Sequence, residues 1–123
     1  AGVSYGRTWT AERESRIAVL PVGYADGLNR RLSNRARFLL NGRSVAQVGT
    51  ICMDMCMLDV TDLPECEVGD VVTIVGRDGD RTSRCQDIAA ALDTISYEVV
   101  CNISKRVPRL YLREGVYGDL YRV

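Results

Sequence analysis

Short apolar runs separated by turn residues mark the first sixty positions of the chain. The run Ile17–Val22 predicts a strand that is covered on both faces. Pro21 has no N–H to donate to a neighbouring strand, so it places this strand near a sheet edge or ends it. Cys56–Val60 predicts another strand, and the stretch 61–70, which contains a proline and a glycine, predicts a connection.

A hairpin is the clearest local signal in the sequence. Arg37–Leu40 and Arg43–Val48 both favour strands, and they flank Asn41 and Gly42. Both of these turn residues tolerate a positive φ, which the commonest two-residue hairpin loop requires. We therefore predict that the two segments pair as antiparallel strands.

Strand signals continue in the second half of the chain. Val71–Val75 is rich in β-branched residues and predicts a strand that stops at Gly76. Asp78 and Gly79 offer a second tight turn of the same chemistry. Leu110–Leu112 lies between two arginines and predicts a short last strand.

Two short helices are also expected in this half. Ser83 and Gln86 form a capping-box pattern, with Ser83 as the N-cap of a helix that runs through Leu92. A second helix is expected from Tyr97 to about residue 103, because the residue before Pro108 avoids the α region. Together the segments predict a mainly β domain, an antiparallel barrel or sandwich with two short helices.

Length and charge narrow the class of protein. The 123 residues suit one domain that buries its own core but is too small for a (β/α)₈ barrel of about 250 residues. Sixteen basic and sixteen acidic residues cancel, which argues against nucleic acid as a partner. No apolar stretch approaches the roughly 18 residues of a membrane span, and no signal-like amino terminus is present. The chain begins with Ala1 and not methionine, so a piece of a longer protein is expected.

The five cysteines are an odd number and make a poor disulfide framework. Alternation along a strand would place Cys52 and Cys56 on one face, as small buried apolar side chains. A zinc site is the alternative, but structural zinc normally requires four closely spaced Cys or His ligands. We therefore favour buried apolar cysteines and expect no metal. Free thiols of this kind fit a reducing cytoplasm.

The chain contains no histidine and one lysine, Lys105, which we expect to be a solvated surface cation. Without histidine it cannot form a Ser-His-Asp or Cys-His catalytic arrangement, and glycine motifs that bind nucleotides are also missing. Three of the six tyrosines, Tyr5, Tyr24 and Tyr97, lie in small-residue or polar contexts. A tyrosine near a strand end usually buries its ring and bonds its hydroxyl locally, so composition alone favours a structural role.

Five segments, taken in order, resemble the carboxyl-terminal domain of the alanine racemase family. They are Val3–Gly6, Val22–Gly27 with the following arginine pair, Val48–Met55, Ile95–Val99 and Arg106–Arg109. The resemblance covers about residues 3–113, and residues 114–123 form an unassigned tail. It implies that residues 1–123 are the β domain of such an enzyme, with the amino-terminal barrel that binds pyridoxal 5'-phosphate absent from the chain.

The resemblance also implies roles at the substrate. Tyr5 resembles the catalytic base that acts on the L-enantiomer side of the α-carbon. Met53 resembles the residue whose main-chain N–H holds the substrate carboxylate. Tyr24 resembles a residue that lines the substrate entrance, with Arg30 and Ile95 further out.

Two barrels are implied as partners. Tyr97 resembles the residue whose hydroxyl touches the phosphate of pyridoxal 5'-phosphate, a cofactor expected in the full-length enzyme and not on this domain alone. Tyr5, Tyr24 and Met53 would reach into the barrel of a second subunit of a homodimer, while Tyr97 would serve the barrel of its own chain. Lys105 does not match the cofactor lysine, which belongs to the barrel.

The chemistry agrees with this division. Racemisation removes a proton from one face of the α-carbon and delivers one to the other, while the cofactor acts as an electron sink. A tyrosine has a pKa of about 10, so only about one in a thousand is ionised at pH 7. The resemblance implies that a barrel histidine, backed by an arginine, lowers this pKa. We therefore expect Tyr5 to be inactive until a barrel docks.

Other functions stay open at this stage. Alanine and serine differ by one hydroxyl. The residues that would distinguish the two substrates lie largely on the barrel, so a serine racemase domain is an alternative. A non-catalytic dimerisation or binding module is a second alternative, because a domain cut from its barrels would expose apolar area. Thr50 stands where many relatives have an arginine, which leaves the selectivity of the entrance open. Family frequency favours alanine.

Overall fold

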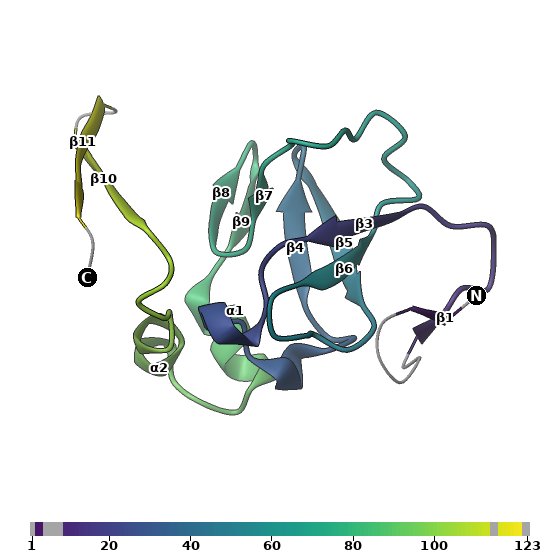
Figure 1. The fold of residues 1–123 in the computed structure, drawn as a ribbon, viewed down its shortest axis with the longest axis horizontal. Coiled ribbons are helices and arrows are strands. Elements are labelled where there is room, and N and C mark those ends of the chain that lie inside the picture. The colour runs from purple at the N-terminus through teal and green to yellow at the C-terminus, as the bar shows by residue number, and fades with distance from the viewer. Residues whose placement is uncertain (1, 4–8, 114–115, 122–123) are drawn as a thin grey trace.

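The fold consists of short strands joined by turns, with a few short helices between them (Figure 1). The structure, a computed structural model, describes the backbone of residues 2–3, 9–113 and 116–121, and the side chains of residues 10–111. Its strands are β1 (Gly2–Val3), β2 (Trp9–Thr10), β3 (Ile17–Leu20), β4 (Arg37–Leu40), β5 (Arg43–Val48), β6 (Cys56–Asp59), β7 (Val72–Thr73), β8 (Gly76–Asp78), β9 (Arg81–Ser83), β10 (Arg109–Arg113) and β11 (Val116–Tyr121). Its helices are the 3₁₀ turns η2 (Tyr24–Asp26) and η3 (Arg30–Leu32) and the α-helices α1 (Cys85–Ala91) and α2 (Ser96–Cys101).

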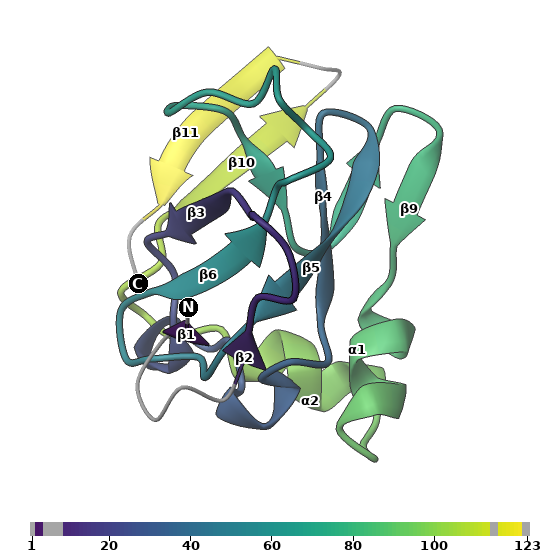
Figure 2. The same ribbon diagram turned by 90° about the vertical axis from the view of Figure 1, so that its right-hand side faces the viewer.

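A five-stranded antiparallel sheet forms the centre of the fold. Its strand order is β3-β6-β5-β4-β7, and every neighbouring pair is antiparallel. The sheet curls into a half-barrel, and α1 and α2 lie at one end of it (Figure 2). The expectation of a mainly β, antiparallel domain with two short helices is therefore confirmed.

The predicted hairpin is present with the expected loop. β4 and β5 pair with Leu40 opposite Arg43, which leaves Asn41 and Gly42 as the two loop residues. Their φ angles are 52° and 76°. Both values are positive, as a two-residue loop that matches the strand twist requires.

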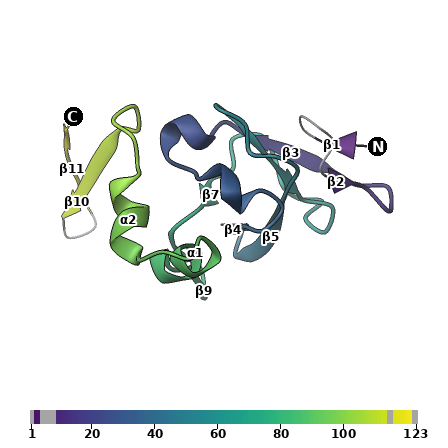
Figure 3. The same cartoon turned by 90° about the horizontal axis from the view of Figure 1, so that it is seen from below.

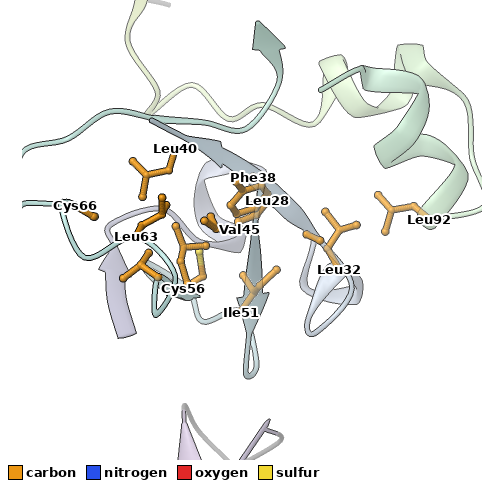
Figure 4. Close-up of a cluster of buried hydrophobic side chains, with 13 residues drawn as sticks. Leu28, Leu32, Phe38, Leu40, Val45, Ile51, Cys56, Leu63, Cys66 and Leu92 are labelled. Atoms are coloured by element: carbon orange, nitrogen blue, oxygen red, sulfur yellow. The ribbon is translucent and has the colours of Figure 1, made fainter. Parts of the chain in front are cut away.

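The core is a cluster of buried side chains between the central strands and the segments around them, and it extends to Leu92 at the end of α1 (Figure 4). In β6 the burial alternates, with Cys56 and Leu58 buried and Met57 and Asp59 half-buried. Each fully buried leucine or phenylalanine contributes about 1.5–3 kcal/mol to folding. The cluster consists of Leu28, Leu32, Ala36, Phe38, Leu40, Val45, Ile51, Cys56, Leu58, Val60, Leu63, Cys66 and Leu92.

The first predicted strand needs a correction. β3 ends at Leu20, so Pro21 does terminate the strand, and β3 is an edge of the sheet. The expectation that both of its faces are covered is wrong, since the Val19 side chain is 60% exposed. A continuous apolar run does not distinguish an edge strand with one open face from a central one.

The segment that follows the connection was also predicted incorrectly. Instead of one strand over residues 71–75, β7 covers only Val72 and Thr73, and β8 begins at Gly76. Gly76 has a φ of +137°, a conformation in which side chains are strained, so this glycine turns the chain from one strand to the next. The turn expected at Asp78 and Gly79 lies one residue later, because Asp78 pairs with Arg81 across the β8–β9 hairpin.

The helix predictions are correct in place and differ at the ends. α1 has Arg84 as its N-cap, and the backbone N–H of Arg84 donates to the Asp87 carboxylate at 3.2 Å. Ser83, the predicted cap, instead donates its hydroxyl to the carbonyl of Ile74 at 2.7 Å. α2 ends at Cys101, two residues before the predicted end.

The two terminal hairpins lie at opposite ends of the long axis (Figures 1 and 3). β1 pairs with β2 at one end, and β10 pairs with β11 at the other. β11 belongs to the tail that the sequence leaves unassigned. Within the described residues, no helix has the length and apolar character needed to cross a membrane.

Candidate functional site

The glycine-rich segment that carries Tyr24 is bent so tightly that one position requires glycine. A Cβ on Gly23 would lie 2.2 Å from the carbonyl oxygen of Cys52 and 2.4 Å from that of Met53. Its φ of −145° is ordinary extended backbone, so the requirement is steric. The close approach allows η2 to begin directly against the loop that carries Met53.

Tyr24 and Met53 are held next to each other by their backbones. The N–H of Tyr24 donates to the carbonyl of Cys52 at 2.9 Å, and the N–H of Ala25 donates to the carbonyl of Met53 at 3.0 Å. A further hydrogen bond, from the N–H of Cys52 to the carbonyl of Met55 at 2.9 Å, closes the loop. Tyr24 and Met53 are 44% and 52% exposed, so both side chains face outward from this junction.

The Met53 loop is also fixed from the other side. The amide oxygen of buried Gln47 accepts from the N–H of Asn34 at 2.9 Å, and its amide nitrogen donates to the carbonyls of Val48 and Gly49. The Ser33 hydroxyl accepts from the N–H of Ile51 at 2.8 Å. These contacts connect the Met53 loop to the turn that follows η3, and η3 begins with Arg30. Thr50, which lies in this loop, is buried and does not present a side chain to solvent.

An arginine joins the two loops electrostatically. The Nε of Arg106 lies 2.8 Å from Oδ1 of Asp26, and its Nη2 donates to Oδ1 of Asp54 at 2.6 Å. The hydrogen bond to Asp54, together with the nearby Asp26 charge, raises the pKa of the Arg106 guanidinium further above its usual range. Asp26 belongs to η2 and Asp54 follows Met53, so a single cation connects the segments of Tyr24 and Met53.

The outer candidates lie on other elements. Arg30 is exposed at the start of η3. Ile95 is the exposed N-cap of α2, and Tyr97 is exposed in its first turn. Tyr5 lies outside the described residues. The structure thus brings Tyr24 and Met53 together, and places the α2 candidates on a separate element.

The end of α2 is nevertheless connected to the glycine segment. The N–H of Ser104 donates to the carbonyl of Asp26 at 3.0 Å. A Cβ on Gly27 would lie 2.3 Å from the carbonyl oxygen of Asn102, so these backbones are in direct contact. Tyr97 is therefore attached to the same framework as Tyr24, through the residues that follow its helix.

The residues Asp26, Asp54 and Arg106 were missed as a group by sequence reasoning. Each lies inside one of the matched segments, but nothing in the local pattern assigns it a role. Their opposite charges were the available signal. Their separation along the chain gave no indication that they meet.

The cysteine pair is only partly as expected. Cys56 is fully buried, which confirms the apolar reading for that residue. Cys52 is half-buried and lies in the loop before β6, so the expectation that both follow one strand is wrong. All five cysteines, which lie in the described part of the chain, are thiols. In the same part, no three potential metal ligands come together.

Burial raises the pKa of the Cys56 thiol from 9.0 to about 11, with a smaller contribution from Cys52. The unfolded thiol ionises near 9, so its contribution to the free energy of unfolding is complete below pH 9 and lost as the pH rises through 11. We expect this loss to be about 2–3 kcal/mol. Urea unfolding between pH 8 and 11 measures it. Cys56→Ala should flatten the decline, whereas Cys101→Ala, at an exposed position, should not; equal slopes for both variants would contradict the assignment.

Comparison with known proteins agrees with the motifs. The family model "Alanine racemase, C-terminal domain" matches residues 1–111. Alanine racemase 1 of Clostridium acetobutylicum is 54% identical over 113 residues, which are 92% of this chain and 29% of that protein. Alanine racemase of Halothermothrix orenii is 51% identical over 110 residues, 89% of this chain and 29% of that protein.

A solved structure gives the same result. The crystal structure of alanine racemase from Bacillus anthracis with bound L-Ala-P has a TM-score of 0.89 and 39% sequence identity, and the match covers 99% of this chain and 31% of that one. The chain thus spans about 30% of the length of the proteins that it matches. It belongs to the alanine racemase family and corresponds to the carboxyl-terminal domain of such an enzyme.

Proposed function

We propose that this chain is the part of a pyridoxal phosphate-dependent alanine racemase that supplies one proton-transfer base and the substrate-carboxylate contact. The observation that carries the proposal is the junction of Tyr24 and Met53, two exposed residues from separate matched motifs. In a chain of this family, an outward-facing pair held by backbone hydrogen bonds is suited to contact a small ligand on another protein body.

Met53 would bind the substrate through its backbone. Among the described residues its N–H donates to no acceptor, while its carbonyl is engaged by Ala25. An available N–H in a fixed loop is a good donor to a carboxylate, because charge-assisted hydrogen bonds are roughly twice as strong as neutral ones. The exposed ring of Tyr24 beside it would narrow the entrance, with Arg30 and Ile95 further out.

Tyr5 would act as the base on the L side of the α-carbon, within the barrel of a second subunit. Tyr97 would donate its hydroxyl to the cofactor phosphate in its own barrel. The positions of the elements support two separate barrels. The β1–β2 hairpin, whose strands flank residues 4–8, and α2 lie toward opposite ends of the molecule (Figures 1 and 3). In a homodimer, each copy of this domain would contact the barrel of its own chain through Tyr97 and the barrel of the partner through Tyr5.

Pyridoxal phosphate would be bound mainly by the barrel. When bound, it supplies the electron sink that stabilises the carbanion. Of this chain's described side chains, the exposed Tyr97 hydroxyl suits a phosphate oxygen. Lys105, the chain's one lysine, is exposed beyond the end of α2, so the lysine that anchors the cofactor would come from the barrel. The five thiols support a reducing, cytoplasmic location.

The isolated chain should not racemise L-alanine when pyridoxal phosphate is added, because the lysine and the activating histidine are elsewhere. The full-length enzyme should produce D-alanine, and mixing the chain with its matching barrel domain should restore activity. Circular dichroism or a coupled D-alanine assay measures both. Turnover by the chain alone, well above the cofactor background, would contradict the proposal. Faster turnover of L-serine than of L-alanine by the full-length enzyme would change the substrate to serine.

A further inference from the structure

One guanidinium holds three chain segments that carry candidate residues. Arg106 bonds Asp26 at 2.8 Å and Asp54 at 2.6 Å. Asp26 is the last residue of η2, which begins with Tyr24, and Asp54 directly follows Met53. Arg106 itself lies five residues beyond α2, whose first turn carries the cofactor-contact candidate.

The carboxylate of Asp26 is shared between side chain and backbone. Its Oδ1 contacts Arg106, and its Oδ2 accepts from the N–H of Gly23 at 2.9 Å. The carbonyl of Asp26 accepts from the N–H of Ser104. The glycine segment is therefore closed by its own hydrogen bond and attached through Asp26 to the turn that holds Arg106.

That turn is itself rigid. The guanidinium of Arg109 donates to the carbonyls of Ser104 and Val107, both at 2.6 Å, and to that of Ile103 at 3.1 Å. A turn closed by three such hydrogen bonds keeps the backbone of Arg106 in place. Arg106 can therefore act as a fixed support for the Met53 loop.

The contribution of these ion pairs to folding should be small. The Arg106 side chain is 51% exposed and that of Asp54 is 57% exposed, whereas that of Asp26 is 14% exposed but keeps the hydrogen bond from the Gly23 N–H when Arg106 is replaced. Exposed ion pairs contribute little to stability because water screens the charges. Geometry is a better reason for the arrangement, since the planar guanidinium directs its Nε and Nη2 to two different carboxylates, and a lysine ammonium does not fix that angle.

We propose that Arg106 is a positioning residue for the racemase reaction: it sets the Met53 N–H at the distance from Tyr24 at which a substrate carboxylate fits between them. The inference rests on the proposed function of Tyr24 and Met53. Arg106 acts through the two aspartates and does not touch the substrate. The chemistry it serves is recognition of a small carboxylate.

The test uses the full-length enzyme with the variants Arg106→Gln, Arg106→Lys and Asp54→Asn. We expect the KM for L-alanine and the inhibition constant of propionate, which is alanine without its amino group, to rise together by about 10- to 100-fold, with a smaller change in kcat. Arg106→Lys should not restore them. Arg106→Gln combined with Asp54→Asn should be no worse than Arg106→Gln alone, because the single substitution already removes the contact with Asp54.

Arg13→Gln is the matched control, since Arg13 forms an exposed ion pair with Asp62 at 3.4 Å away from these loops. Neither it nor Arg106→Gln should shift Tm by more than a few degrees. A lowered Tm with unchanged KM and propionate binding would overturn the proposal, as would full rescue by Arg106→Lys.

Amide hydrogen exchange separates this proposal from the proposed function. Exchange at the hydrogen-bonded amides of Tyr24, Ala25 and Cys52, which hold the two loops together, should accelerate in Arg106→Gln whether or not the enzyme turns over. If the wild type racemises no amino acid, the proposed function fails, and unchanged exchange in the variant overturns the positioning role independently.

Discussion

In the full-length enzyme, Tyr5→Phe is expected to lower kcat for racemisation by about 10²–10⁴-fold, the usual contribution of a positioned acid or base. The substitution removes one oxygen and leaves a ring of almost the same size, so substrate binding should change far less. The effect should be confined to one face of the substrate, because the base proposed for the D side belongs to the barrel.

Exchange of the α-hydrogen in deuterated water tests this asymmetry. With Tyr5→Phe, exchange starting from L-alanine should be lost, and exchange starting from D-alanine without inversion should persist. Tyr111→Phe is a suitable control, because Tyr111 is an exposed residue of β10 and lies 106 positions after Tyr5 in the sequence. A Tyr5→Phe enzyme with wild-type kcat would refute the role of Tyr5 as the base.

The parts of the fold that the sequence predicted correctly are those that local chemistry decides. Asn41 and Gly42 fix a hairpin because the loop needs two positive φ angles, and no distant residue alters that need. The caps of α1 show the opposite case. Ser83 has the right chemistry for an N-cap, but a tertiary hydrogen bond to Ile74 takes its hydroxyl, and the helix starts one residue later.

In the candidate site, too, some residues could be identified from the sequence and others could not. Tyr24 and Met53 were identified by resemblance, and the structure shows that backbone hydrogen bonds between residues 24–25 and 52–53 bring them together. Arg106 could not be assigned a partner from the sequence, because the aspartates it bonds lie 80 and 52 residues earlier in the chain. Ion pairs between such distant residues depend on the packing of whole segments. Periodicity and propensity describe only neighbouring residues.

The close contact at Gly23 leads to the second large expected effect. Gly23→Ala should destabilise the protein by about 1–3 kcal/mol or more and lower kcat/KM of the folded full-length enzyme by about 100-fold. The new methyl group would lie 2.2 Å from the carbonyl oxygen of Cys52, so the glycine segment and the Met53 loop must move apart. That movement would weaken the hydrogen bond between Tyr24 and Cys52 and displace the Met53 N–H.

Gly69→Ala is the informative comparison, because the backbone conformation favours glycine at position 69, whereas lack of space for a side chain requires glycine at position 23. Gly69 has open space for a Cβ but a φ of +99°, so alanine there costs about 1–2 kcal/mol in backbone strain and touches nothing. Thermal unfolding should show a lower Tm for both variants, whereas kcat/KM per folded molecule should fall only for Gly23→Ala. If the two variants lost activity equally, the spacing of the two loops would not determine how the substrate is held, and general destabilisation would explain the result. If Gly23→Ala kept wild-type kcat/KM, the junction of Tyr24 and Met53 would have no part in the reaction.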